Sequence, residues 1–590
     1  MDSIITQPDY IKKRNELFNN WKADYDKKIE ELPKTEIQVK LPDDSMKYGT
    51  SFLTTPMDIA LQISKSLASS AILSKVDGEK WDLMRPLEKD CSLELLKMDH
   101  EEAMDVFWHS SAHIMGECVE MFYQAHVVHG PPVKDGFFYD FQSKTRNITQ
   151  TDYPEIEKLF TQFTREKQPF ERLELSKEQL LELFSYNKYK TKFIDEKVTG
   201  KSTVYRCGTF IDFCRGPHIP NNKLIGSICI YKSGCSYWQG NPNLDQLQRL
   251  YGISFKSRKE LVEWKKFREE ADKRSHRVIG RDQQLFMFND LSPGSAFFLP
   301  HGTHIYNRLV SFLRKIYWKR NYKEVITPNI FNTKLFQTSG HYQHYDDNMF
   351  SFKVDNEMFS MKPMNCPSHC LIFKSRMRSW RELPLKIADF GALHRNEFSG
   401  ALHGLTRVRR FAQDDAHIFC TLNQLKSVIN ECIDFVKEVY DIFEFEFFME
   451  LSTRPEKYMG SLGDWNSAEK HLEEALNLFG GKWKFNHGDG AFYGPKIDIK
   501  IKDALKREHQ CATIQVDFQQ PKNFDLKYLD DESMNATNEP VIVHRAILGS
   551  IERFFGILCE HTGGKWPFWI SPRQAIIVPI SPELNNYALE

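Results

Sequence analysis

The sequence predicts a multidomain α+β protein, and three observations lead to this class. At 590 residues, the chain has room for several domains of about 100–200 residues each. Its 41% hydrophobic and 27% charged residues are typical of a globular protein with large cores. Strand-like and helical runs follow one another in blocks of different composition, with no repeat of 20–50 residues. This pattern favours separate α+β domains over a repeat array.

The first hundred residues hold a charged segment and a small α+β module. Residues 1–35 are predicted to form a charged helical extension. Residues 37–41 alternate like a strand, and Thr55, Pro56 and Asp58 begin a helix with a capping residue, a first-turn proline and a capping-box carboxylate. Strand-like pieces follow near residues 71–76 and 92–96. We therefore expect a module of the β-grasp kind over residues 36–100.

Four further segments follow the module. Residues 101–255 are predicted to form an α+β domain that carries its own cluster of histidines and cysteines, with helices around His109 and over 154–166. Residues 256–285 are rich in charge with apolar residues at helical spacing, which predicts a linker helix. Residues 286–571 form the main body. In the last segment, 572–590, the run QAIIVPI at 574–580 is typical of a buried strand.

Charge and cysteine usage restrict the class of protein further. The formal net charge is −1, so any nucleic-acid partner would have to bind local basic patches. Twelve cysteines scattered over 590 residues do not form the framework of a small disulfide-rich protein, and we expect reduced thiols in a cytoplasmic protein. The first 36 residues fit neither a signal peptide nor a transit peptide, and no run of 18 apolar residues predicts a membrane span.

A predicted hairpin carries the most informative polar residues. Residues 387–397 and 408–419 are predicted to be two antiparallel strands. With a period of two, one face of the second strand presents a set of polar and aromatic side chains, and Arg395 and Glu397 share a face of the first. The set on the second strand is Arg409, Phe411, Gln413, Asp415 and His417. Such a face makes a good polar site, although a solvated face of an antiparallel sheet is the alternative.

Five motifs resemble those of class II aminoacyl-tRNA synthetases in their threonyl form. FGALHRNE at 390–397, GALHGLTR at 400–407 and RFAQDDAH at 410–417 together resemble motif 2. KPMNCPSH at 362–369 and GAFYGPK at 490–496 support the match, HRAILGSIER at 544–553 resembles motif 3, and Pro328 stands where motif 1 has its proline. The resemblance runs from residue 37 to 579. It implies a class II antiparallel sheet flanked by helices, preceded by a β-grasp TGS domain and an α+β editing domain.

The resemblance implies a threonine–tRNA ligase that uses ATP with Mg²⁺. Threonine would be activated to threonyl-adenylate and passed to tRNA(Thr), so the protein mainly holds the reactants and stabilises phosphate charge. By resemblance, Arg395 contacts the α-phosphate, Glu397 the adenine amino group and Phe411 the adenine ring. Arg407 and Arg553 take the other phosphates, which suits the guanidinium fork. Lys496 and Gln510 match further positions near ATP.

By resemblance, Cys366, His417 and His544 are ligands of one zinc ion. Their spacings of 51 and 127 residues carry no local metal signature, and a lone strand histidine is more often a core residue. Three protein ligands would leave zinc open to the substrate, so that the amino group and the hydroxyl of threonine could bind there. Valine has no such hydroxyl and would be rejected. Gln413, Asp415, Tyr493 and Gln515 match the rest of the threonine pocket. His341 is a candidate for helping to deprotonate the tRNA ribose.

A second cluster lies in the segment 101–255. HSSAH at 109–113 places His109 and His113 on one helix face, and CRGPH at 214–218 adds Cys214 and His218. By chemistry alone these four residues could bind zinc. They resemble instead the editing domain, in which such residues hydrolyse seryl-tRNA through a water molecule, and Lys190 and Asp212 match further editing positions. Serine lacks only a methyl group, which gives a synthetic site about 1–3 kcal/mol of discrimination, so a second site is needed. A zinc-binding editing site remains the alternative.

Two departures from the family pattern affect the predictions. Arg410 stands where a glycine is expected. Its long side chain would either crowd the nucleotide side or lie on the face opposite Phe411, as its parity in the strand predicts. Residues 572–590 resemble only the start of the C-terminal anticodon-binding domain. An activation-only or editing-only paralogue and a non-catalytic RNA-binding protein are therefore alternatives to the ligase. Motif 1 implies a homodimer, and the apolar helix around 316–322 fits either a dimer contact or a buried helix.

Overall fold

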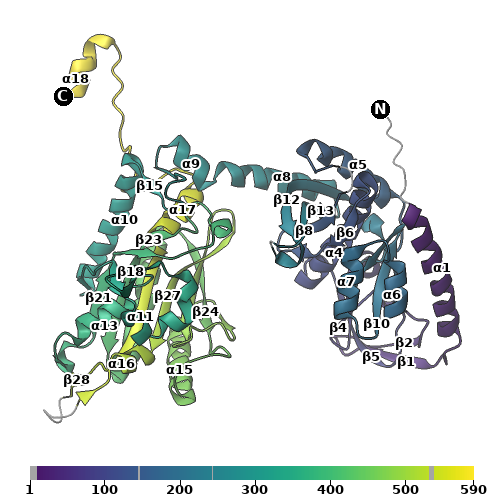
Figure 1. Cartoon of the computed structure of the whole chain (residues 1–590), viewed down its shortest axis with the longest axis horizontal. Coiled ribbons are helices and arrows are strands. Elements are labelled where there is room, and N and C mark those ends of the chain that lie inside the picture. The colour runs from purple at the N-terminus through teal and green to yellow at the C-terminus, as the bar shows by residue number, and fades with distance from the viewer. Residues whose placement is uncertain (1–8, 144–145, 242, 531–536) are drawn as a thin grey trace. The chain divides into compact units, whose positions relative to one another are not determined.

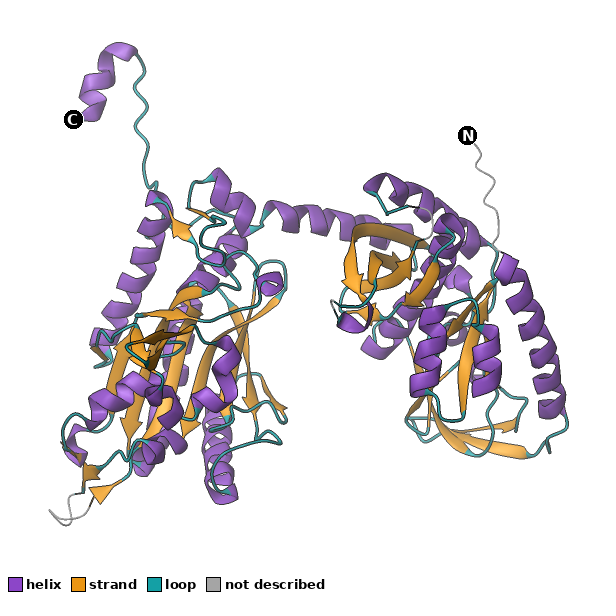
Figure 2. Ribbon diagram, in the orientation of Figure 1, coloured by secondary structure: helices purple, strands orange, loops and turns teal. Residues whose placement is uncertain are grey.

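The computed structural model describes residues 9–143, 146–241, 243–530 and 537–590. The chain forms two compact units, Met1–Phe267 and Arg268–Glu590, in which helices and sheets are mixed (Figures 1 and 2). The segment predicted as one linker helix is two helices, α8 (Arg258–Lys273) and α9 (His276–Asp282). They are separate because Ser275 has an extended ψ of 124° between them. Within the described ranges, no helix combines the length and apolar character that a membrane span requires.

The first unit begins with a long helix and a five-stranded sheet. The sheet has the order β2-β1-β5-β3-β4, with β1 and β5 parallel and the other pairs antiparallel. The predicted capping box of Thr55 and Asp58 is present at the start of α2. The elements are α1 (Asp9–Glu30), β1 (Glu36–Lys40), β2 (Met46–Thr50), α2 (Pro56–Ile63), α3 (Lys65–Ser70), β3 (Leu73–Val76), β4 (Glu79–Trp81) and β5 (Cys91–Leu96).

The rest of the first unit contains two sheets. In the larger, of order β12-β13-β8-β6, the buried helix α4 packs against β8 (Figure 1), and β7 also pairs with β8. The smaller has the order β11-β10-β9. The elements are α4 (Glu101–Tyr123), β6 (His126–His129), β7 (Pro132–Val133), β8 (Gly136–Gln142), α5 (Tyr153–Arg165), β9 (Glu171–Ser176), α6 (Lys177–Leu183), α7 (Lys188–Lys197), β10 (Lys201–Cys207), β11 (Phe210–Phe213), β12 (Ser227–Tyr237) and β13 (Gln246–Phe255).

The charged N-terminal helix α1 is anchored in the first unit. Phe18 is fully buried in a core with residues of β9 and α6. The Arg14 guanidinium is 1% exposed and donates two hydrogen bonds to Glu120 of α4, at 2.7 and 2.6 Å. Removing one partner of a buried charge pair of this geometry strongly destabilises the fold, because the other charge is left buried and unpaired. The helix is therefore part of the folded unit.

The second unit is built on a nine-stranded, mainly antiparallel sheet. The order is β16-β21-β23-β30-β27-β26-β24-β25, and β22 pairs with β23. Helices α14 and α17 pack against its central strands β23 and β30, forming the largest core. The elements are β16 (Lys323–Glu324), β21 (Leu385–Asp389), β22 (Ala392–His394), β23 (Arg410–Cys420), α14 (Leu425–Ile442), β24 (Glu446–Ser452), α15 (Leu462–Phe479), β25 (Trp483–Asn486), β26 (Lys496–Lys502), β27 (Glu508–Asp517), β30 (Val541–Ser550) and α17 (Ile551–Thr562).

Shorter elements surround this sheet. They include three small sheets, β14-β15, β17-β19-β18 and β20-β28-β29. The elements are β14 (Phe286–Met287), β15 (Phe297–Phe298), α10 (Pro300–Lys319), β17 (Ile330–Asn332), α11 (Lys334–Thr338), α12 (His341–Tyr345), β18 (Ser351–Val354), β19 (Glu357–Met361), α13 (Cys366–Lys374), β20 (Arg378–Ser379), α16 (Gln519–Asn523), β28 (Tyr528–Leu529), β29 (Thr537–Asn538) and α18 (Asn585–Leu589).

The prediction of a buried strand over residues 574–580 is wrong. These residues are in no strand, and no described strand pairs with them. Ile576, Ile577 and Ile580 are 86%, 72% and 94% exposed. An apolar run becomes a buried strand only where neighbouring strands accept its backbone hydrogen bonds and its side chains.

Candidate active sites

The predicted hairpin forms, and strand register brings its histidine beside two other predicted residues. β23 pairs antiparallel with β21, and His417 on β23 lies directly opposite His544 on β30. His544 in turn lies opposite Gln515 on β27. Because directly opposed residues have Cβ atoms about 5 Å apart, three neighbouring strands present His417, His544 and Gln515 side by side.

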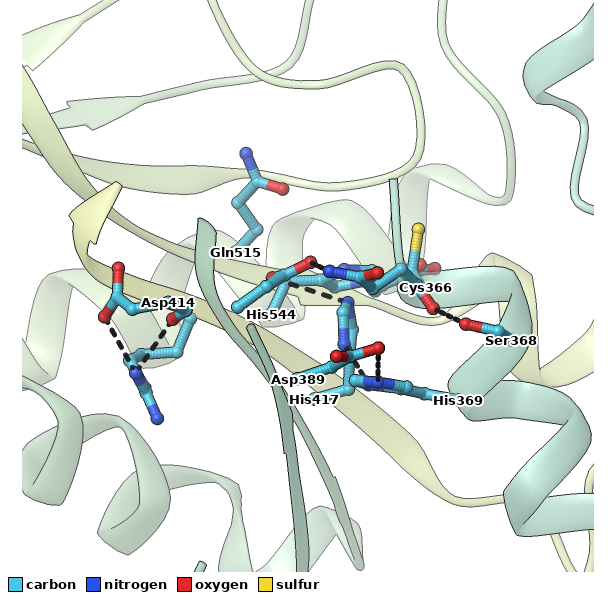
Figure 3. Close-up of polar contacts among 12 residues, drawn as sticks. Cys366, Ser368, His369, Asp389, Asp414, His417, Gln515 and His544 are labelled. Carbon is cyan, nitrogen blue, oxygen red and sulfur yellow. Dashed lines mark hydrogen bonds and ion pairs between the residues drawn. The ribbon is translucent and has the colours of Figure 1, made fainter. Parts of the chain in front are cut away.

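Cys366 completes a buried cluster with the two histidines. It is the first residue of α13, and its sulfur and one nitrogen from each of His417 and His544 lie within 4.8 Å of one another (Figure 3). Burial raises the pKa of the Cys366 thiol well above its usual range and lowers the pKa of His417 well below it. One thiol and two neutral imidazoles form a donor set that zinc prefers, and a bound cation would favour the thiolate. The residues therefore fit a zinc ion.

Further side chains orient the two histidines. His544 Nε2 lies 2.9 Å from Asp517 Oδ2, and His417 Nδ1 lies 2.7 Å from His369 Nδ1. The other ring nitrogen of His369, Nε2, lies 3.9 Å from Asp389 Oδ2 (Figure 3). Carboxylates and imidazoles in such positions fix the tautomer and the ring orientation of metal-binding histidines. The sequence did not reveal these partners; His369 lies within the quoted KPMNCPSH segment and could have been found there.

Three of the four predicted threonine-pocket residues, Asp415, Tyr493 and Gln515, lie beside this cluster, while Gln413 pairs with Ser550 at the far side of the register shift. Asp415 Oδ2 accepts a hydrogen bond from Asn365 Nδ2 at 3.2 Å, and burial raises the pKa of Asp415. The Tyr493 hydroxyl donates to Gln515 Oε1, and the Tyr493 ring lies 5.3 Å from the His544 ring. His341 is 3% exposed, with Nε2 4.0 Å from Cys366 Sγ and Nδ1 2.8 Å from Ser339 Oγ. His341 thus lies beside the cluster.

The pairing of β23 with β30 is interrupted by a register shift. Between Gln413 and Asp415 the register with β30 shifts, and Arg409 lies before the strand begins. The Asp414 carboxylate is fully buried and accepts hydrogen bonds from the backbone N–H groups of Ile547, Leu548 and Gly549 at 2.8–2.9 Å. One residue of β23 therefore stands against three of β30, Ile547, Leu548 and Gly549, and the extra residues of this bulge belong to β30.

The hairpin gathers most of the predicted ATP residues. The Arg395 guanidinium lies 5.0 Å from the centre of the Phe411 ring, and Arg407 forms an ion pair with Glu397 at 2.9 Å. Arg410 instead forms an ion pair with Glu552 at 3.0 Å.

The remaining predicted ATP residues come from β26, β27 and α17. Lys496 and Gln510 share the Asp498 carboxylate, at 2.8 and 2.5 Å. Lys496 also lies opposite Gln515 in the sheet, next to the predicted threonine pocket. Arg553 Nε is buried and has no hydrogen-bond partner among the described residues. An unpaired buried guanidinium N–H suits an anionic ligand.

The second cluster forms in the first unit. His109 and His113 lie on α4, and Cys214 and His218 lie in the loop after β11. Cys214 Sγ is 3.3 Å from His109 Nε2 and 3.4 Å from His218 Nε2, and the rings of His113 and His218 are 4.3 Å apart. The ligand atoms of all four residues lie within 4.8 Å of one another.

A large cavity and a neutralised carboxylate adjoin this cluster. The cavity of about 1010 Å³ is lined by His109, His113, Lys190, Asp212 and Cys214, among others. Lys190 forms a buried ion pair with Asp212, which also accepts from the Tyr139 hydroxyl. Although burial opposes it, Lys190 holds the pKa of Asp212 below its usual value. The six residues predicted for editing are thus brought together.

Hydrogen bonding fixes the tautomer of His218. Ser110 Oγ donates to Val106 O at 2.7 Å and accepts from the Ile219 N–H at 3.1 Å. Its remaining contact is His218 Nδ1 at 3.0 Å, which must therefore be the donor. His218 Nε2 is then unprotonated and faces Cys214. Burial lowers the pKa of His109 to about 4 and raises that of the Cys214 thiol, so the cluster can hold a water molecule or a cation.

Comparisons with known proteins agree with this architecture. Residues 350–562 match the family described as tRNA synthetase class II core domain (G, H, P, S and T), 37–97 the TGS domain, and 202–251 the threonyl and alanyl tRNA synthetase second additional domain. The antiparallel sheet of the second unit, with its arginine-bearing hairpin, is thus that of a class II aminoacyl-tRNA synthetase.

Whole-chain similarity narrows the class. Threonine–tRNA ligase 1, cytoplasmic, from Bos taurus is 54% identical over 98% of this chain and 81% of its own length. Threonine–tRNA ligase 2, cytoplasmic, from Homo sapiens is 53% identical over 99% and 73%. A crystal structure of the RNA binding domain of threonyl-tRNA synthetase from Cryptosporidium parvum Iowa II is 54% identical, with a TM-score of 0.53 over 53% of this chain and 79% of that one. The chain belongs to the threonyl-tRNA synthetase family.

Proposed function

We propose that the second unit activates threonine with ATP and transfers it to tRNA(Thr), and that the first unit hydrolyses seryl-tRNA(Thr). The chain is a threonine–tRNA ligase with an editing domain, as its family and its 54% identity over 98% of its length indicate. The observation that supports the synthetic site best is the register of β23, β30 and β27, which presents His417, His544 and Gln515 beside Cys366. The relatives are named cytoplasmic, and we assign this chain to the cytoplasm.

We assign the domains around the matched segments. Residues 1–35 are the helical extension, 36–100 the TGS domain, 101–255 the editing domain, 256–285 the linker, 286–571 the catalytic domain and 572–590 the start of an anticodon-binding domain. The segments 37–97, 202–251 and 350–562 that match known families fall inside three of these ranges, which supports the assignment.

Cys366, His417 and His544 would hold one zinc ion in the synthetic site. When bound there, the ion would supply a Lewis acid for the amino group and hydroxyl of threonine. Around it, the Asp415 carboxylate and the linked Tyr493 and Gln515 side chains orient the amino acid. His341, at 4.0 Å from Cys366 Sγ, is close enough to the pocket to take up the ribose proton during transfer.

ATP with Mg²⁺ would bind along the hairpin. Phe411 offers its ring to adenine, and Arg395 beside it reaches the α-phosphate. Glu397 and Arg407 pair with each other at 2.9 Å. On ATP binding this ion pair would be exchanged for the adenine amino group and a phosphate. Arg553 has an unpaired Nε for a further phosphate, and Lys496 and Gln510 complete the site around Asp498. The charge developing on the phosphates is stabilised by these fixed cations.

The editing site would use a water molecule held by His109, His113, Cys214 and His218. The unprotonated His218 Nε2 can accept a proton from such a water. The Lys190 and Asp212 pair supplies a fixed dipole at the cavity wall without a net charge. A zinc ion in this cluster is the alternative.

We propose a homodimer that uses apolar residues in the last turn of α10 and shortly after it. The Ile316, Tyr317 and Tyr322 side chains are buried in this chain's own core, which accounts for them without a partner. Trp318 and Ile326 are 84% and 93% exposed, and apolar side chains so exposed mark a contact surface. Trp318→Arg or Ile326→Arg should shift the mass measured by light scattering from dimer to monomer.

Pyrophosphate exchange into ATP tests the synthetic assignment. The chain should exchange with threonine about 10⁴-fold better than with valine, because the site is built around a hydroxyl. Equal exchange with both amino acids, or none with zinc bound, would reject the threonine site. A non-catalytic RNA-binding role fits less well, since Arg395 and Arg553 are both present.

A further inference from the structure

The loop that carries two of the editing residues is held from two sides. On one side, Thr203 Oγ1 donates to Cys214 O at 2.6 Å and Ser110 Oγ contacts His218 Nδ1 at 3.0 Å. Within the loop, the Gly216 N–H donates to Cys214 Sγ at 3.1 Å. The residue before His218 is Pro217, which has no N–H to donate. The next two backbone N–H groups hold the end of the loop: that of Ile219 donates to Ser110 Oγ at 3.1 Å, and that of His218 needs an acceptor of its own.

The acceptor for that N–H comes from a different domain. Asp82, directly after β4 in the segment that matches the TGS domain, accepts the His218 N–H through Oδ1 at 2.8 Å. Its Oδ2 accepts the Tyr205 hydroxyl at 2.7 Å. The Tyr205 ring lies 4.6 Å from the His218 ring. One carboxylate thus holds both the backbone of His218 and an aromatic ring beside its imidazole.

The position of Asp82 is set by the core of the TGS module. Asp82 O accepts the Arg85 N–H at 3.1 Å, closing a tight turn. The next residue, Leu83, is fully buried, and its carbonyl accepts the Met57 N–H at 3.0 Å. Leu87 is also fully buried in this core. The carboxylate is therefore presented by the β-grasp fold at a fixed place.

Because His218 is buried, loss of its hydrogen bond to Asp82 would disturb the editing site. His218 is 1% exposed, and a buried N–H without an acceptor is strongly unfavourable. If Asp82 were absent, His218 would have to move to find an acceptor. Its Nε2 would then leave the 3.4 Å contact with Cys214 Sγ. A displacement of about 1 Å at a catalytic group can reduce a rate about 100-fold.

We propose that Asp82 of the TGS domain is a positioning residue of the editing site. It acts through the backbone of His218 and not on the substrate, and so gives the TGS domain a role in hydrolysis of seryl-tRNA. The inference rests on the proposed editing function of the cluster. The two can fail separately, because the hydrogen bond and the hydrolysis are measured by different experiments.

Three variants of the full chain test the proposal. Asp82→Ala removes the acceptor, while Asp82→Asn keeps an oxygen that can accept the His218 N–H. Asp90→Ala is the matched control, because Asp90 of the same domain accepts one backbone N–H, from Gln38, at 2.8 Å. We expect Asp82→Ala to lower kcat for deacylation of preformed seryl-tRNA about tenfold or more, with KM unchanged within about twofold. Asp82→Asn should keep most of the rate, and Asp90→Ala all of it.

Hydrogen exchange followed by mass spectrometry reads the contact directly. Asp82→Ala should speed exchange in a peptide covering residues 215–220, while Asp82→Asn and Asp90→Ala leave that peptide protected. Threonine-dependent pyrophosphate exchange should stay within about twofold of the parent in all three, which shows that the chain is folded. If the parent does not deacylate seryl-tRNA, the editing assignment fails while the exchange data still test Asp82. Unchanged protection of 215–220 and unchanged kcat in Asp82→Ala, or an equal loss in Asp90→Ala, would overturn the proposal.

Discussion

The two histidine and cysteine clusters use the same donors in different electrostatic surroundings. Two carboxylates contact the histidines of the first cluster, Asp517 at 2.9 Å from His544 and Asp415 at 4.0 Å from His417. A third, Asp389, lies 3.9 Å from His369, which contacts His417. One buried lysine, Lys362, lies 3.4 Å from Asp389. These contacts leave more negative than positive charge beside the donors, which favours a cation.

Around the second cluster, the carboxylate that contacts a histidine ring is paired with a lysine. Asp212 lies 3.7 Å from His113 and is paired with Lys190, whereas Asp82 contacts the backbone of His218. His218 donates to a serine hydroxyl in place of a carboxylate. The type of donor alone therefore does not decide whether a cluster binds metal or water, because the outer partners of the donors set the local charge. We therefore expect zinc in the first cluster and water in the second.

The largest expected effect follows from removing the sulfur of the first cluster. Cys366→Ala should lower threonine-dependent pyrophosphate exchange about 10³-fold or more, because a Lewis acid is worth several kcal/mol. Cys370→Ala is the matched control, since Cys370 is an equally buried thiol on the same helix. An equal loss in both variants would mean that packing, and not metal binding, causes the effect.

The corresponding change in the second cluster should separate the two activities. His113→Ala should slow deacylation of seryl-tRNA about 100-fold through loss of proton transfer and water placement, and leave pyrophosphate exchange unchanged. His129→Ala, at the wall of the same cavity but outside the cluster, should deacylate normally. Equal clearance of seryl-tRNA by the parent and His113→Ala would reject the editing assignment.

The outer carboxylates sharpen the comparison further. Asp517→Asn should weaken zinc binding about 10–100-fold in a chelator competition, because Asp517 orients His544. Asp212→Asn, which changes the carboxylate of the other cluster, should leave zinc affinity unchanged and slow deacylation. A fall in zinc affinity in Asp212→Asn would show that the second cluster also binds metal.

The smallest effect concerns pH. Burial lowers the pKa of His109 to about 4, from an ordinary value of 6.5. A histidine with a lowered pKa in the folded state contributes stability that is present above pH 6.5 and is lost as the pH falls toward 4. For His109 this amounts to about 3 kcal/mol. The unfolding temperature of the first unit, measured by calorimetry, should therefore fall as the pH is lowered from 6.5 to 4. His109→Gln should weaken this pH dependence. An unchanged dependence in His109→Gln would contradict the burial of a neutral His109.

Local signals in the sequence predicted much of the fold and the identity of the site residues. The Thr55 capping box, the hairpin and the motif residues are encoded within a few positions of one another. The outer partners are not, because His417 and His369 are 48 residues apart, and Arg14 and Glu120 are 106 apart. The register shift opposite Asp414 comes from extra residues of β30, and no described strand pairs with residues 574–580. Sequence patterns describe a segment, whereas these features belong to pairs of segments.

Zinc content measures directly which of the two clusters binds metal. Zinc per chain, measured by mass spectrometry of the purified metalloprotein, should be one in the parent, one in Cys214→Ala and none in Cys366→Ala. Two zinc ions in the parent, or loss of zinc in Cys214→Ala, would contradict the assignment of metal to one cluster and water to the other.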